Sequence, residues 1–122
     1  MMRKFIKFLY KITPFKKPLF LLIRKLFNPS QRIYKHLHFK GVIKVAIEPD
    51  KFYLMQHFGY QIENELFWKG VYGGWEKVSL TIWAELSKNA DIIFDIGANS
   101  GVYALISKSI NTNSEVHAFE PV

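Results

Sequence analysis

The sequence contains no cysteine among its 122 residues. Disulfide bonds and thiolate metal ligands are therefore excluded, and a reducing compartment is weakly favoured. Acidic side chains are missing from the first 44 residues, which carry 12 lysines and arginines. The remaining residues hold 5 basic and 10 acidic side chains. A strongly basic N-terminal segment thus precedes a mildly acidic remainder, within a net charge of +7.

Long apolar runs are also missing from the basic segment. Its longest run, LFLLI at 19–23, is far shorter than the roughly 20 apolar residues of a transmembrane helix. A secretory signal would need a longer apolar region and a cleavage site of small residues, and neither is evident. We therefore expect a cytoplasmic protein, either free or peripheral at the inner membrane face.

Residues 1–40 are expected to form a basic amphipathic arm. The opening stretch MMRKFIKFLYKI places Lys4, Lys7 and Lys11 on one helical face, opposite apolar side chains. Three uses are open: packing on the body of the protein, peripheral contact of residues 1–25 with an anionic membrane, or non-specific attraction of nucleic acid. Because no base-reading motif accompanies the charge, specific nucleic-acid binding is not expected.

The middle of the chain predicts a hairpin followed by a helix. The stretches at 41–47 and 52–58 are rich in strand-forming residues, and the turn Glu48-Pro49-Asp50-Lys51 separates them. A helix is expected over about 76–88, after a double glycine.

Two sets of residues in this region raise the question of a ligand site. The tryptophans are interpreted as packing residues rather than as the lining of a pocket: Trp68, Trp75 and Trp83. His36 and His38 would share one face of a strand, but the sequence places no third ligand beside them. No metal site is therefore expected.

The most informative stretch is DIIFDIGANSG, which begins at Asp91. An apolar strand over 92–96, buried on both faces, is expected to lead through a glycine loop into a helix over about 100–110. A second strand over 115–119 should lie parallel to the first. The sequence therefore predicts a strand–helix–strand unit with its loop at the carboxyl edge of the strands, where ligands bind in such folds.

The residues of the loop discriminate between nucleotide ligands. Asn99 and Val102 stand where a dinucleotide-binding fingerprint requires glycine, and the Gly-Lys-Ser/Thr of a phosphate-binding loop is missing. Asp95 would repel a pyrophosphate and favour a cationic group. Glu120, at the end of the second strand, is placed to accept hydrogen bonds from ribose hydroxyls. Together these features fit S-adenosyl-L-methionine (SAM).

The motifs D-I-G-A-N-S-G and A-F-E-P resemble those of the FkbM family of SAM-dependent methyltransferases. The resemblance covers about 60–122 and implies an α/β, Rossmann-like class I methyltransferase fold, with O-methylation of a sugar or other small hydroxyl acceptor. The N-terminal part of that domain is expected over 41–122. The resemblance also implies the SAM-binding residues: Asp95, Gly97, Ala98, Asn99 and Gly101 in the loop, and Glu120 at the ribose.

A complete fold of this class has about seven strands, whereas the sequence predicts the first strand–helix–strand unit, preceded by a hairpin region and the basic arm. We therefore expect the N-terminal portion of a methyltransferase, marginally stable and inactive by itself. No catalytic residue or general base is assigned. The alternative is a non-catalytic module whose basic arm docks on a membrane or a protein partner.

Overall fold

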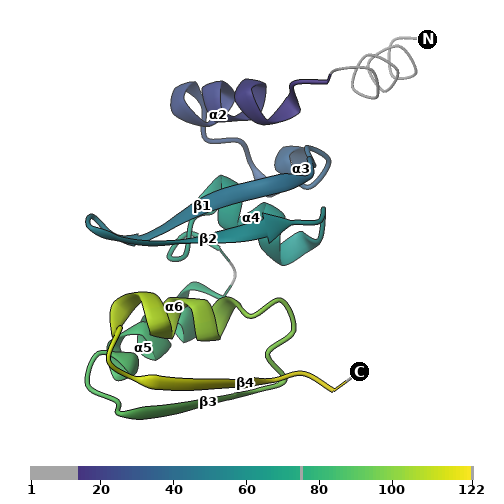
Figure 1. Ribbon diagram of the computed structural model, residues 1–122. Helices are drawn as coiled ribbons and strands as arrows, with labels where there is room; N and C mark the ends of the chain where they lie inside the picture. The colour runs from purple at the N-terminus through teal and green to yellow at the C-terminus, as the bar shows by residue number, and fades with distance from the viewer. Residues whose placement is uncertain (1–13, 75, 122) are drawn as a thin grey trace, which may run out of the picture.

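The computed structural model describes residues 14–74 and 76–121. The helix expected over the first twelve residues, with its three lysines, and the packing of Trp75 lie outside this range. The described residues form a mixed α/β structure with two small sheets (Figure 1). In chain order the elements are α2 (Lys16–Leu26), α3 (Gln31–Tyr34), β1 (Gly41–Glu48), β2 (Lys51–His57), α4 (Gln61–Lys69), α5 (Lys77–Ser87), β3 (Ile92–Ile96), α6 (Val102–Ile110) and β4 (Glu115–Phe119).

The predicted hairpin is confirmed. Strands β1 and β2 pair antiparallel, with Gly41 opposite His57 and a register irregularity between Ala46 and Glu48. Alternate side chains of both strands are buried, as the period of two in a strand requires. The inward-facing residues are Ile43, Val45 and Ile47 on β1 and Tyr53, Met55 and His57 on β2.

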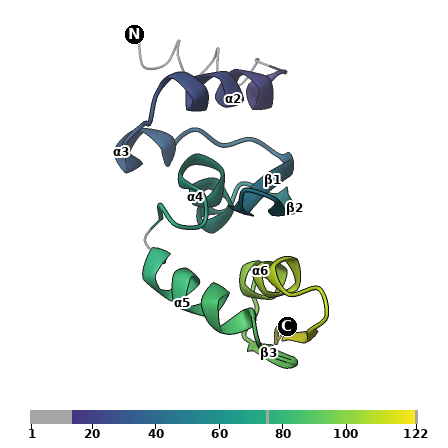
Figure 2. The same ribbon diagram turned by 90° about the vertical axis from the view of Figure 1, so that its left-hand side faces the viewer.

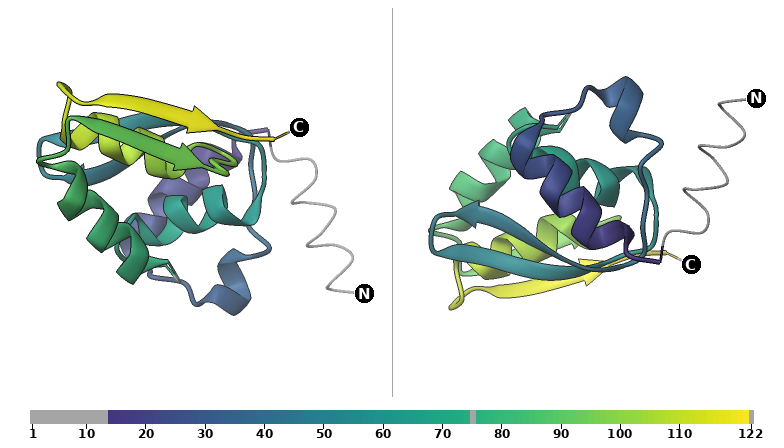
Figure 3. Two further views of the ribbon diagram at one scale, coloured as in Figure 1. Left: turned by 90° about the horizontal axis from the view of Figure 1, so that it is seen from below. Right: turned by 90° about the horizontal axis from the view of Figure 1, so that it is seen from above.

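The described part of the basic segment packs on the body of the protein. Helix α2 crosses above α4 (Figure 3, right), and its Phe20 is only 2% exposed. The Phe20 ring lies 6.0 Å from Phe39 and 5.5 Å from Trp68. Arg24 donates to the carbonyl of Phe67 at 2.6 Å. Residues before and after residue 40, where the basic arm was expected to end, therefore belong to one hydrophobic core. No described helix is long and apolar enough to cross a membrane.

The strand–helix–strand unit is also confirmed. Strands β3 and β4 pair in parallel, with Ile92 opposite Glu115 and Ile96 opposite Phe119. Helix α6 packs on them and on α5. The Trp83 indole of α5 donates to the Ser107 hydroxyl of α6 at 2.7 Å, so Trp83 packs between these two helices. Trp68 is also a packing residue, because it is buried in the core.

Helix α6 lies between the hairpin and the β3–β4 sheet in two perpendicular views (Figures 1 and 2). It thereby joins the half of the molecule that contains the hairpin to the half that contains the β3–β4 sheet, through one core. The buried apolar members of that core are Phe20, Tyr34, Phe39, Ile43, Val45, Ile47, Tyr53, Met55, Leu66, Phe67, Trp68, Val71, Leu80, Ala84, Val102, Ile106 and Ile110.

The expectation that the strand over 92–96 is buried on both faces is wrong. Ile92, Phe94 and Ile96 are 56%, 58% and 76% exposed, while the alternate residues face α6. Both helices of this half lie on one side of the sheet, and the other side forms an outer face of the molecule (Figure 3, left). There the rings of Phe94 and His117 stack at 5.2 Å.

His57 is a fully buried titratable side chain at the end of β2. Its Nδ1 accepts the Gly59 N–H at 2.9 Å, and the Phe39 ring lies 4.7 Å away. Burial lowers the pKa of His57. A hydrogen bond with Asn64 and the Glu63 carboxylate oppose that shift, while His38 adds to it. The folded protein therefore favours neutral His57 at a pH where the unfolded chain binds a proton.

We expect the free energy of unfolding to fall as the pH drops below about 6.5, the ordinary pKa of histidine in an unfolded chain. The unfolded chain then takes up a proton that folded His57 does not, which costs up to about 1.4 kcal/mol per pH unit until the lowered folded pKa is reached. Guanidinium unfolding at pH 7.5 and 5.5 measures the fall. His57→Gln should reduce it, whereas the control His117→Gln should leave it largely in place; an unchanged fall in His57→Gln contradicts the assignment.

Candidate functional site

The loop between β3 and α6 contains three residues in the left-handed region of backbone space. The φ angles are 80° at Gly97, 48° at Asn99 and 77° at Gly101. Glycine adopts such angles without strain, and asparagine does so more readily than most residues. An added Cβ at Gly97 or Gly101 would meet no atom within 4 Å. The backbone conformation, rather than crowding, therefore explains these two glycines, and open space adjoins both.

The loop is tied to the end of β4 by main-chain hydrogen bonds. The N–H groups of Gly97 and Ala98 both donate to the carbonyl of Phe119, at 2.7 and 3.0 Å. The N–H of Gly101 donates to the carbonyl of Ala98 at 2.7 Å, which closes the turn. These bonds hold the predicted loop residues and the end of the second strand together.

Asp95 lies beneath the loop rather than on its surface. Its side chain is 7% exposed, and Oδ2 accepts the N–H of Ala104 in the first turn of α6 at 3.1 Å. The carboxylate thus satisfies one free backbone donor of the helix and interacts favourably with the helix dipole. Contact between Asp95 and a methionine ammonium group stays a prediction.

Glu120 lies against the loop. Its Oε2 accepts the N–H of Asn99 at 2.5 Å, and the side chain is exposed. Because a carboxylate offers about four acceptor sites, Glu120 can still accept hydrogen bonds from a diol. The structure therefore brings together all six residues expected in the site: Asp95, Gly97, Ala98, Asn99, Gly101 and Glu120.

A cleft separates the loop from the start of α4. Two hollows of about 360 Å³ each adjoin there and share Tyr60, Asn99 and Ser100 as lining residues. We call them together the loop cleft. Gln61 and Ile62 also line the first hollow, and Phe58 and Leu105 are among the other residues that line the second. The combined size lies in the range of sites for small organic ligands, roughly 300–1,000 Å³.

Glu63 builds the wall opposite the loop. Its carboxylate, 1% exposed, accepts the N–H groups of Phe58, Gly59 and Tyr60 at 2.6, 3.2 and 3.2 Å. These bonds fix the turn between β2 and α4. They also hold the backbone of Tyr60, which lines the cleft.

This wall was not predicted, because no helix was expected over Gln61–Lys69. Two signals were present: Glu63 three residues after the N-cap, as in a capping box, and Gly70 directly after the helix. Tyr60 is not a usual N-cap residue, which weakened the first signal. In the described part of the chain, no group of three or more histidine and acidic side chains could hold a metal ion.

Comparison with known proteins adds no relative. No family model matches the sequence, and neither a curated protein nor a solved structure gives a significant match.

We expect Glu63→Gln to lower the free energy of unfolding by about 1–3 kcal/mol, because three N–H groups that donate to a carboxylate oxygen would then share a neutral amide oxygen, which is a weaker acceptor. Chemical denaturation at pH 7.5 measures the loss. Glu85→Gln, on an exposed part of α5, is the matched control and should change stability by less than about 0.5 kcal/mol. Equal losses in both variants would exclude the capping role.

Proposed function

We propose that the chain binds S-adenosyl-L-methionine in the loop cleft, as part of a Rossmann-like class I methyltransferase. The observation that carries the proposal is the pair of carboxylates at the carboxyl edge of the parallel strands. Asp95 accepts a hydrogen bond from a backbone N–H of α6, and Glu120 accepts one from a backbone N–H of the loop. An acid on each strand next to a glycine loop suits a nucleoside that also carries positive charge.

The same contacts disfavour a phosphate ligand. A phosphate site at a helix N-terminus needs free N–H groups and no neighbouring negative charge. Here the N–H groups of Gly97 and Ala98 are taken by Phe119, and those of Asn99 and Ala104 by carboxylates. The buried charge of Asp95 further offsets the positive end of the helix dipole.

The residues present fit the cofactor. Glu120 would accept hydrogen bonds from the ribose hydroxyls, and open space next to Gly97 and Gly101 would allow close approach of the ligand. Tyr60 and Ile62 offer apolar surface for the base across the cleft. The negative charge of Asp95 would favour the methionine ammonium and the sulfonium.

The outer face of the β3–β4 sheet supports the Rossmann-like part of the proposal. Parallel sheets are generally covered on both faces, yet Phe94 and Ile96 are largely exposed here. This apolar face is suited to burial within a larger sheet domain.

The chemistry supplied by the bound cofactor is an activated methyl group on a sulfonium. Transfer to a sugar or other small hydroxyl requires that hydroxyl to align with the sulfur–methyl bond. The residues of this chain are proposed to bind and orient the cofactor; no side chain is assigned as the base.

S-adenosylhomocysteine should bind the chain measurably by isothermal titration calorimetry. Glu120→Ala should weaken binding at least about tenfold, because two charge-assisted hydrogen bonds to the ribose are lost. Glu115→Ala, at the opposite end of the same strand, is the matched control and should leave the affinity within about twofold. Absence of binding, or equal weakening by both variants, would rule out the proposed cofactor site.

A second candidate function is peripheral contact with an anionic membrane, supported by the surface of α2. Leu22 and Leu26 are 55% and 67% exposed, and Lys25 lies between them in sequence. Apolar side chains next to lysines on one helix are typical of interfacial helices. The apolar side chains insert into the membrane surface, and the lysines attract anionic headgroups.

Leu22→Ser combined with Leu26→Ser should weaken binding to phosphatidylglycerol vesicles at least about tenfold, because partial burial of two leucines contributes about 1 kcal/mol each. Vesicle co-sedimentation measures the change. Val78→Ser with Ile82→Ser on α5 is the control, since these side chains are similarly exposed at 62% and 55%. If both double variants behave alike, α2 is not the membrane contact.

A further inference from the structure

A second concave site lies on the other side of the β2–α4 turn. It is a hollow of about 490 Å³ lined by the start of α2, the segment before β1 and the turn itself. We call it the α2 pocket. Its lining residues are Pro14, Phe15, Lys16, Lys17, Pro18, His38, Phe39, Lys40, Phe58 and Gly59.

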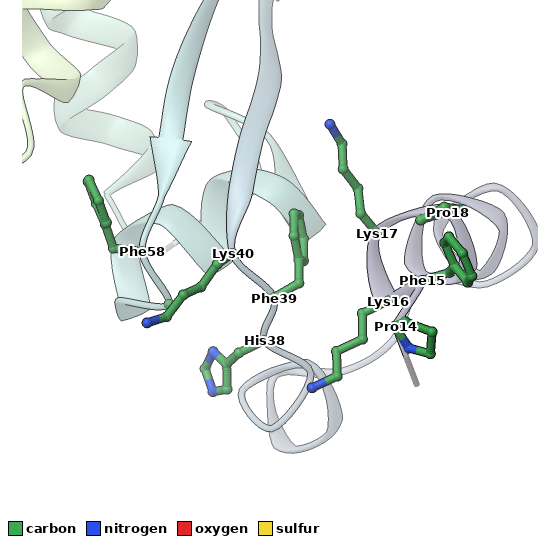
Figure 4. Close-up of a pocket in the computed structure, with 10 residues that line it drawn as sticks. Pro14, Phe15, Lys16, Lys17, Pro18, His38, Phe39, Lys40 and Phe58 are labelled. Atoms are coloured by element: carbon green, nitrogen blue, oxygen red, sulfur yellow. The ribbon is translucent and has the colours of Figure 1, made fainter. Parts of the chain in front are cut away.

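The polar lining of the α2 pocket is cationic. Three lysines and one histidine contribute to it, and no acidic residue does. Lys17 donates to the carbonyl of Val42 at 2.6 Å, which fixes this side chain along one wall. Lys16 and Lys40 extend toward the side of the pocket on which His38 lies (Figure 4). Several cationic groups around one hollow concentrate positive potential there.

Three of the six remaining lining residues are aromatic: Phe15, Phe39 and Phe58. Phe15 and Phe58 are 71% and 57% exposed, and they come from segments far apart in the sequence. Aromatic faces beside ammonium groups suit a ligand with a charged end and an apolar end. A compact dianion such as phosphate matches two or three lysines better than a single carboxylate does, since lysine binds phosphate as a point charge.

We propose that the α2 pocket binds a phosphate monoester. The phosphate lies among Lys16, His38 and Lys40, and the organic group packs against either Phe15 or Phe58, which lie on opposite sides of the pocket (Figure 4). The phosphate is carried either by a soluble metabolite or by an anionic lipid headgroup, and these two sources share the same recognition chemistry.

The α2 pocket is separate from the loop cleft. The segment from Phe58 to Tyr60 divides the two sites: Gly59 lines the first, Tyr60 lines the second, and Phe58 contributes to both. Glu63 is the one acidic residue among those that line the loop cleft, and Asp95 and Glu120 lie in and against the adjoining loop, whereas lysines and a histidine line the α2 pocket. The ligands proposed for the two sites therefore differ in charge, and the inference does not depend on SAM binding.

Phenyl phosphate is the soluble probe, and calorimetric titration of residues 1–122 measures its affinity. The test variant combines Lys16→Ala with Lys40→Ala. The matched control combines Arg32→Ala with Lys35→Ala, which removes the same charge from exposed positions of the same basic segment. Lys16→Arg with Lys40→Arg keeps the charge, and far-ultraviolet circular dichroism checks that all variants fold.

Saturable binding of phenyl phosphate, weakened at least about tenfold in the test variant and within about twofold in the control, supports a soluble ligand. The arginine variant should bind within about threefold of the original chain. The source is a lipid headgroup if the chain instead binds vesicles that contain phosphatidic acid and does not bind pure phosphatidylcholine vesicles. The test variant should then lose this binding, whereas the control variant should keep it.

Two results overturn the proposal. One is the absence of binding to both probes. The other is an equal loss in the test and control variants, which shows diffuse attraction by the basic segment rather than a pocket. S-adenosylhomocysteine titration of the test variant separates the sites, because an unchanged affinity there is expected whichever way the phosphate experiment turns out.

Discussion

The buried carboxylate of Glu63 is the contact on which both concave sites depend. It accepts three consecutive backbone N–H groups, from Phe58 to Tyr60, at the point where β2 ends and α4 begins. A charge that is 1% exposed is stable only when hydrogen bonds replace its lost water. The turn is therefore held in one conformation, and that conformation supplies a wall to the loop cleft and to the α2 pocket.

Asp95 performs a comparable task beneath the loop that forms the opposite wall of the loop cleft. It is nearly buried and takes a backbone donor of α6, much as Glu63 takes the donors before α4. Both walls thus begin with an inward carboxylate whose hydrogen bonds stabilise the local backbone. One consequence is electrostatic: the free donors that a helix start usually offers to an anion are occupied here, and negative charge remains beneath the loop.

Local signals predicted the elements that carry the candidate site. The apolar run at 92–96, the loop glycines and the periodicity of α6 lie within one short stretch, so the strand–helix–strand unit could be read from sequence. The full set of six site residues was implied by the family resemblance of the loop and strand-end motifs. The opposite wall was missed although its hydrogen bonds are local, because Tyr60 is not a usual N-cap residue and the start of α4 was not recognised. The packing of α2 could not be read from sequence, because it depends on contacts distant in the chain, such as that of Phe20 with Trp68. The exposed outer face of the β3–β4 sheet was not predicted, because a short apolar run is compatible with a strand that is buried on one face or on both.

The rigidity of the Phe58–Tyr60 segment also bears on how the two sites would act together. Coupling between sites requires an element with two arrangements whose balance both ligands shift. The dividing segment instead has its N–H groups bound to a buried carboxylate, and His57, fully buried, accepts a further bond from Gly59. Moving it would break several of these bonds at once, at about 1–3 kcal/mol for each donor left unsatisfied. We therefore expect the two sites to act independently while sharing a fixed wall.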